Sequence, residues 1–225
     1  MRRIGRVMIA AALPLVAGAT AARAQLAGIP VYFNPRGGTG FGVAANLGFP
    51  NSNAGGGTAY GVAASLGGGP FTITGMVGAW KGTGFGSAQA SYGGDVAYKV
   101  FGGGLLPVAI GLQAGYGAVK VPSIAGNVTQ STVPIGVGIS FDPPLFPLKP
   151  WIAPRLEVEH MSAGGSTVNA TSFRISAGVN FNLLLGLGVH AGVDWGKVPS
   201  KIDPATPSTL IWGVGAHFNF HVPMM

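Results

Sequence analysis

The charged and imidazole side chains of this 225-residue chain are the groups best suited to acid–base or ion-conducting chemistry, and most of them lie in its last third. They alternate with apolar residues, and this spacing places them on one face of β-strands. Such a row fits two roles: a charged constriction that tunes a pore, or an ion-pair network that fills a closed interior. The candidates are Arg155, Glu157, Glu159, Arg174, His190, Asp194 and His217, with Asp95 and Lys99 from an earlier segment.

Catalysis is the third chemistry to weigh, because His190 and Asp194 share a strand face. An acid–base site also needs a converging third group, and the sequence shows no such constellation. No P-loop, H-E-x-x-H or G-x-S-x-G motif occurs, and the four histidines and six acidic residues lack metal-ligand spacing. We therefore expect no enzyme, no catalytic residue, no cofactor and no metal site.

The chain begins with an export signal. Arg2, Arg3 and Arg6 form a basic region, residues 7–16 are apolar, and Ala-Arg-Ala at 22–24 fits a signal-peptidase site. We expect residues 1–24 to be cleaved and residues 25–225 to form one domain. Nine basic and six acidic residues then remain, so the whole-chain charge of +7 overstates the basicity of the mature protein. Its scattered lysines predict no nucleic-acid surface.

Composition indicates that much of the surface avoids water. Charged residues make up 8% of the chain, whereas soluble domains have about 25%. The hydrophobic share of 48% is ordinary, which argues against disorder. The absence of cysteine excludes disulfides and thiolate metal sites.

Apolar residues recur at every second position, which predicts strands. In one segment Phe173, Ile175 and Val179 share a face, and Arg174 and Asn180 lie on the other. One face suits hydrocarbon and the other suits a barrel interior. Ten segments follow this pattern: 40–49, 58–67, 70–80, 87–100, 107–118, 132–141, 151–161, 171–182, 186–195 and 209–220.

Connections and aromatic residues add to the pattern. Short turns alternate with longer polar loops predicted at 50–57, 119–131, 162–170 and 196–208, although 142–150 and 81–86 fit this alternation less well. Aromatic residues collect near segment ends, which predicts two girdles at the membrane interfaces. We place Trp80, Trp195 and Trp212 in the outer girdle and Trp151 in the periplasmic one.

Over residues 38–220 the chain resembles the small outer-membrane β-barrels of Gram-negative-type bacteria. The signal, the alternation, the loop asymmetry and the terminal Phe218-Asn219-Phe220 carry this resemblance. It implies an all-β, closed, antiparallel, up-and-down transmembrane barrel of about ten strands, with eight as the fallback. It also implies a location in the bacterial outer membrane, with outer-membrane lipid and the barrel-assembly machinery as partners; a specific protein partner is not indicated.

Three functions stay open at this stage. The first is a porin-like passive pore for small hydrophilic solutes. The alternative is a non-conducting structural or surface-binding barrel. An exported soluble β-sandwich is the least favoured, because its outer faces would carry charge; here the non-apolar face is mostly small and uncharged.

Overall fold

The computed structural model describes residues 26–30, 40–103, 106–123, 126–143, 146–163 and 165–220. The predicted signal, residues 1–24, lies outside these ranges, so its cleavage stays a prediction. Among the described residues, no helix is long and apolar enough to cross a membrane.

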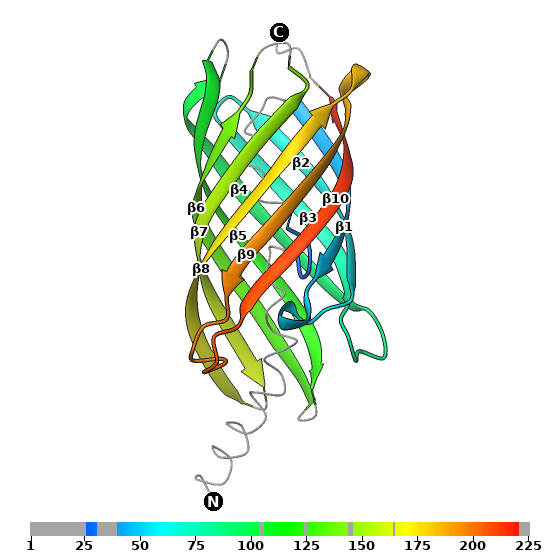
Figure 1. Ribbon diagram of the computed structural model, residues 1–225, viewed down its shortest axis with the longest axis vertical. Helices are drawn as coiled ribbons and strands as arrows, with labels where there is room; N and C mark the ends of the chain where they lie inside the picture. The colour runs from blue at the N-terminus through cyan, green and yellow to red at the C-terminus, as the bar shows by residue number, and fades with distance from the viewer. Residues whose placement is uncertain are drawn as a thin grey trace, which may run out of the picture.

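Ten antiparallel strands form one closed barrel, which confirms the ten alternating segments and the closed fold that the resemblance implied (Figure 1). Each strand pairs with its neighbours in the chain, and β1 pairs with β10 from Phe41↔Phe220 to Pro50↔Ile211 to close the cylinder. Short 3₁₀ turns, η2 (Ser52–Ala54) and η3 (Leu184–Gly186), lie in two of the connections. The strands are β1 (Gly40–Pro50), β2 (Thr58–Gly68), β3 (Phe71–Lys81), β4 (Gln89–Gly103), β5 (Leu106–Ser123), β6 (Gly126–Phe141), β7 (Leu148–Ala163), β8 (Ser166–Asn182), β9 (Leu187–Lys197) and β10 (Ser208–Phe220).

The two ends of the barrel differ. We call the end with the connections 69–70 and 183–186 the turn end, where β1 begins and β10 finishes. The opposite end, with connections 51–57, 82–88 and 198–207, is the loop end, which faces down in Figure 1.

Two of the predicted loops are wrong, because residues 119–131 and 162–170 lie mostly within the long hairpins β5–β6 and β7–β8. The inward–outward alternation continues through them, and Val121 and Val128 remain buried. A strand that keeps burying every second side chain has no reason to stop, even where Ser, Thr and Asn dominate the sequence. The predicted turn 142–150 is also shorter, since β7 begins at Leu148.

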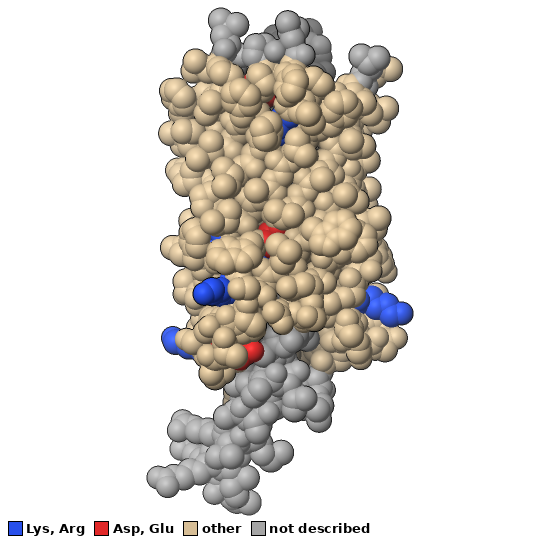
Figure 2. All heavy atoms as spheres, in the orientation of Figure 1, with Lys and Arg blue, Asp and Glu red and all other residues tan. Residues whose placement is uncertain are grey.

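The outer face of the barrel is apolar. Phe173, Val193 and Trp212 are 43–51% exposed, and the inward Arg174 is 1% exposed. Figure 2 shows a face almost free of charged atoms between its two ends. A closed strand cylinder with an apolar belt satisfies its backbone without water, which is the architecture of a small outer-membrane barrel.

Two tryptophans contradict the predicted girdles. Trp80 and Trp151 point into the barrel and are 0% and 5% exposed. Each occupies an inward position of its strand, and each packs over small residues that leave room for an indole. Strand parity therefore decided their direction, rather than the preference of aromatic rings for the interface.

The interior is wide. The stagger of the strands can be measured by starting at Asn46 and moving from each residue to its partner on the next strand. In one direction this route reaches Met161 of β7, and in the other it reaches Lys149 of the same strand. The stagger around the barrel is therefore twelve residues. Ten strands at this stagger give a radius of about 10 Å to the strand axes. Strands lined by glycine and alanine cannot fill such a space, so what fills it decides the function.

Candidate functional site

The central feature of the interior is a buried ionic layer, which we define as Arg155, Glu157, Arg174 and Asp194 with Ser176. Strand pairing brings them together: Arg155 lies opposite Arg174, and Ser176 lies opposite Asp194. All five side chains are at most 3% exposed. Three adjacent strands, β7, β8 and β9, thus present two cations and two anions to one another.

Hydrogen bonds join the whole ionic layer. Arg155 donates from Nε to Glu157 (2.7 Å), from Nη1 to Ser176 (2.7 Å) and from Nη2 to Asp194 (2.6 Å). Arg174 donates from Nε to Asp194 Oδ2 (2.8 Å) and also from Nη2. Ser176 Oγ donates to Asp194 Oδ1 (2.8 Å). The two arginines and two carboxylates balance in charge, which is how buried ions are normally tolerated.

Glu159 lies next to this layer on β7 and accepts a hydrogen bond from Ser172 Oγ of β8 (2.8 Å). It is 1% exposed. The late acidic and basic candidates of the sequence therefore lie in one continuous buried region of the wall.

Closer to the loop end, the interior becomes an apolar layer. Trp80 is its largest member; its Nε1 donates to the carbonyl oxygen of Gly56 (3.0 Å), and Phe85 packs edge-on at 5.1 Å. Ile202 comes from the β9–β10 connection and caps the same cluster. Water is excluded from this level of the barrel, since Trp80 and Ile211 are fully buried and Ile202 is 2% exposed.

A segment outside the strands completes this layer. Residues 26–30 lie inside the barrel, where Leu26 is 0% and Ile29 1% exposed. They contact glycines of four strands: Gly48, Gly61, Gly78 and Gly213. Sequence reasoning missed this segment. A short apolar stretch directly after the predicted cleavage site was the available signal.

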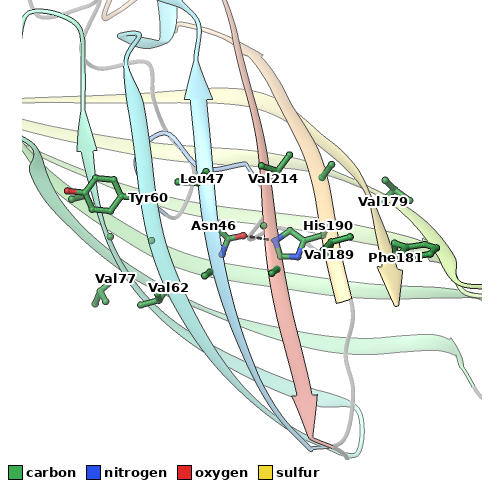
Figure 3. Close-up of a pocket in the computed structure, with 17 residues that line it drawn as sticks. Asn46, Leu47, Tyr60, Val62, Val77, Val179, Phe181, Val189, His190 and Val214 are labelled. Atoms are coloured by element: carbon green, nitrogen blue, oxygen red, sulfur yellow. Dashed lines mark hydrogen bonds between the residues drawn. The ribbon is translucent and has the colours of Figure 1, made fainter. Parts of the chain in front are cut away.

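A histidine pair lies towards the turn end. His190 Nε2 is 2.6 Å from Asn46 Oδ1 (Figure 3), and the Nδ1 atoms of His190 and His217 are 3.0 Å apart. The imidazole rings are stacked, with centroids 5.3 Å apart. The residues in Figure 3 line a hollow of ≈1070 Å³, in which His190 and Asn46 lie beside apolar residues such as Leu47 and Val62.

The remaining candidates lie elsewhere. Asp95 and Lys99 are on the inward face of β4, half-buried, and Asp95 shares a hydrogen bond with Thr74 of β3. In the order of the barrel, β5 and β6 separate β4 from β7, the nearest strand of the ionic layer. The structure thus groups Arg155, Glu157, Glu159, Arg174 and Asp194, and leaves the histidine pair and the early pair apart from them.

These contacts show what the site can do. Asp194 is engaged by two arginines, and His190 by Asn46 and His217, so the two do not form the acid–base pair considered from sequence. Within the described ranges, no group of three or more His, Asp or Glu side chains is placed to hold a metal ion. The arrangement is suited to filling and closing the lumen.

No protein-family model matches the chain, and no curated protein does. Among solved structures it is similar to the N-terminal β-barrel domain of Pseudomonas aeruginosa OprF, at 14% identity over 82% of this chain and 100% of that one, with a TM-score of 0.41. Neisserial surface protein A gives 16% identity, coverage of 82% and 100%, and a TM-score of 0.41. The translocator domain of the autotransporter NalP from Neisseria meningitidis gives 14%, 82% and 90%, and 0.45. The likeness concerns the fold and carries no inference about activity.

Proposed function

We propose that this protein is a non-conducting barrel of the bacterial outer membrane, with a structural or surface-binding role. Its lumen is closed near the loop end, and this single observation carries the proposal. Every strand contributes a buried inward residue to the loop-end half of the lumen: Gly48, Ala59, Trp80, Ser91, Val121, Val128, Met161, Ala170, Gly196 and Ile211.

The turn-end half of the lumen has a different character. Some of its inward residues, among them Ser65, Thr74, Asp95 and Lys99, are partly accessible, whereas Thr72, Ser140 and Trp151 are buried. We call the partly accessible region the vestibule, and the closed loop-end half makes it a blind one. A passive diffusion pore needs a continuous aqueous path, and the apolar and ionic layers interrupt it.

The location follows from the outer face and the ends. A lipid-facing belt supports residence in a membrane, and closed β-barrels are the form in which strands cross one. With β1 beginning and β10 finishing at the turn end, that end faces the periplasm. The long hairpins β5–β6 and β7–β8 then reach beyond the outer surface, where exposed residues such as Lys120, Thr167 and Asn169 offer polar contacts.

Conductance decides the proposal. The refolded full chain, added to a planar lipid bilayer, should give no channel steps across a range of salt concentrations. Folding is checked in the same sample by the heat-dependent change in gel mobility. Steady conductance from folded wild-type protein would overturn the closed-lumen proposal.

A porin-like passive pore for small hydrophilic solutes is the second candidate, because the vestibule is accessible and lined by small residues. Under that hypothesis the wild-type protein conducts, and substitution of Asp95 or Lys99 changes the ion preference. Both residues face the vestibule outside the ionic layer, so such variants leave the network intact.

A further inference from the structure

The histidine pair on β9 and β10 has the geometry of two ligands to one metal ion. We propose that His190 and His217 bind a divalent transition-metal ion between their Nδ1 atoms, with copper(II) as the preferred ion. This inference goes beyond the proposed closed lumen, because metal binding does not depend on whether the barrel conducts.

Strand pairing brings the two imidazoles together through a sequence motif that both strands share. On each strand a glycine stands two positions before the histidine. The register sets His190 of β9 opposite Gly215 of β10, and His217 of β10 opposite Gly188 of β9. Residues two positions apart on a strand share a face, so all four lie on the inward side of this hairpin. The two imidazoles therefore project into the same part of the lumen.

The two glycines provide the room that the rings occupy. A Cβ atom on Gly215 would collide with His190 Nε2, and a Cβ atom on Gly188 would collide with His217 Nε2. Each ring therefore lies across the backbone of the neighbouring strand, where a larger residue would displace it. The result is a stack with an interplanar angle of 17°, in which the two Nδ1 atoms are 3.0 Å apart.

Asn46 of β1 determines which nitrogen of His190 is available to a metal. Its Oδ1 is an acceptor and lies 2.6 Å from His190 Nε2, so Nε2 carries the proton. A neutral imidazole protonated at Nε2 presents its lone pair at Nδ1, which here is the atom nearest His217. Histidines that bind metals almost always donate their other ring N–H to an oxygen acceptor, which fixes the ring. Asn46 supplies this acceptor.

The distance between the two Nδ1 atoms fits a shared ion. Metal bonds to histidine nitrogen are about 2.0–2.1 Å long. Two such bonds to atoms 3.0 Å apart enclose an angle of about 95° at the metal. A nearly right angle is typical of tetragonal copper(II) and nickel(II) sites, whereas zinc favours the wider tetrahedral angle. Copper(II) also binds nitrogen ligands more tightly than the other divalent first-row metals, so we expect it to be preferred.

Metal binding requires one proton to move within the pair. Without metal, His217 donates its Nδ1–H to the Nδ1 lone pair of His190. When the ion binds, this proton passes through water to His217 Nε2, so both imidazoles stay neutral and both Nδ1 atoms face the metal. Water can reach the site and complete the coordination, because both rings are half-buried. The described residues place no group of three or more His, Asp or Glu around an ion, so the protein supplies two nitrogen ligands.

Titration of the refolded full chain with copper(II) tests the site. A background variant, His160→Ala/His221→Ala, leaves the pair as the only histidines of the chain. Electron paramagnetic resonance counts the coordinated nitrogen atoms, and competition with a chelator of known affinity gives the Kd. His160→Ala alone is the matched control, because exposed His160 also contacts an asparagine, with Nδ1 2.7 Å from Asn169 Oδ1. Folding of every variant is checked by heat-dependent gel mobility.

We expect one copper(II) ion per chain, bound by two imidazole nitrogens, in the background variant and in the His160→Ala control. Asn46→Ala should weaken binding about 10–100-fold, and loss of either histidine of the pair should weaken it at least as much. Asn46→Asp keeps an oxygen acceptor for His190 Nε2 and should restore the affinity. Zinc(II) should bind more weakly than copper(II).

Two results would overturn the site. The first is a background variant that binds no copper(II), or binds it with fewer than two imidazoles; this count needs no substitution at the pair, so it is decisive even where a pair variant folds poorly. The second is a folded His190→Ala/His217→Ala variant that binds copper(II) as tightly as wild type. If wild type conducts but binds copper(II) through the pair, the closed lumen fails and the metal site stands.

Discussion

Asp194 is the shared acceptor of the ionic layer, and its replacement by alanine is the sharpest test of how the barrel is held closed. Arg155 would keep its bonds to Glu157 and Ser176. Arg174 would lose the hydrogen bonds to its main partner and retain only Glu157, at 3.7 Å. Asp194→Ala therefore strands a guanidinium group that is 1% exposed in the wild-type barrel.

The expected cost is large. Breaking a buried pair by removing one partner costs about 3–5 kcal/mol. For a chain of this size, that corresponds to a fall in Tm of about 6–20 °C. The matched control is Asp142→Ala, which removes the Asp142–Lys149 ion pair; Asp142 is 41% exposed in that pair. Because solvent screens that pair, the control should cost no more than about 1 kcal/mol.

Urea unfolding in lipid vesicles measures both variants. A repair variant separates charge from packing: Arg174→Met in the Asp194→Ala background removes the stranded charge and should recover much of the lost stability. The reasoning is refuted if Asp194→Ala is no worse than Asp142→Ala. It is also refuted if the repair variant is no better than Asp194→Ala alone, because the cost would then come from packing.

Three further outcomes follow from the side-chain directions. Brominated lipid should quench the fluorescence of Trp212, which is 50% exposed on the outer face, and spare that of Trp80, which is buried in the lumen; quenching of both, measured in single-tryptophan variants, would contradict the assigned facing. Val193→Lys places a charge in the lipid belt and should lower the unfolding free energy by up to about 2–4 kcal/mol, measured in urea, whereas no loss would place Val193 outside the hydrocarbon. His190→Ala leaves the 4%-exposed Asn46 without its 2.6 Å hydrogen bond and should cost about 1–3 kcal/mol in the same assay; a neutral result would mean that water replaces the imidazole.

The strands and their facing could be predicted from sequence because lipid and lumen demand opposite side chains at alternate positions. Phe173, Arg174 and Ile175 show this directly: a shift of one residue would expose the arginine to lipid and bury both apolar neighbours. A one-residue shift would be unfavourable on every strand for the same reason, so the sequence strongly determines the register. The count of about ten strands followed from the same alternation, whereas the closed order was expected from the resemblance to outer-membrane barrels.

Strand ends and the filling of the lumen could not be predicted in this way. Val121 and Val128 continue the alternation into segments whose polar composition suggested loops. Tryptophan is a typical girdle residue, but Trp80 and Trp151 occupy inward positions in the alternation of their strands. The alternation, rather than the residue type, set the direction of these side chains. Composition alone was a weaker signal at these positions than alternation.

The contacts between distant residues were out of reach for a different reason. The sequence placed Arg155, Glu157, Arg174 and Asp194 on inward faces, but their hydrogen bonds depend on the stagger between β7, β8 and β9. The segment 26–30 carries no periodic signal at all. It packs against four glycines, and a glycine has no side chain whose type could point to its partner.

The position of residues 26–30 also constrains the order of assembly. Residues 26–30 precede β1 by ten positions and lie within a cylinder whose seam is the β1–β10 pair. A closed wall of hydrogen-bonded strands has no lateral entrance. The segment must therefore be enclosed when the last strand joins the first, or must enter afterwards through one end of the barrel. In the first case β1 and β10 pair around residues 26–30, so the step that closes the barrel also fills its lumen.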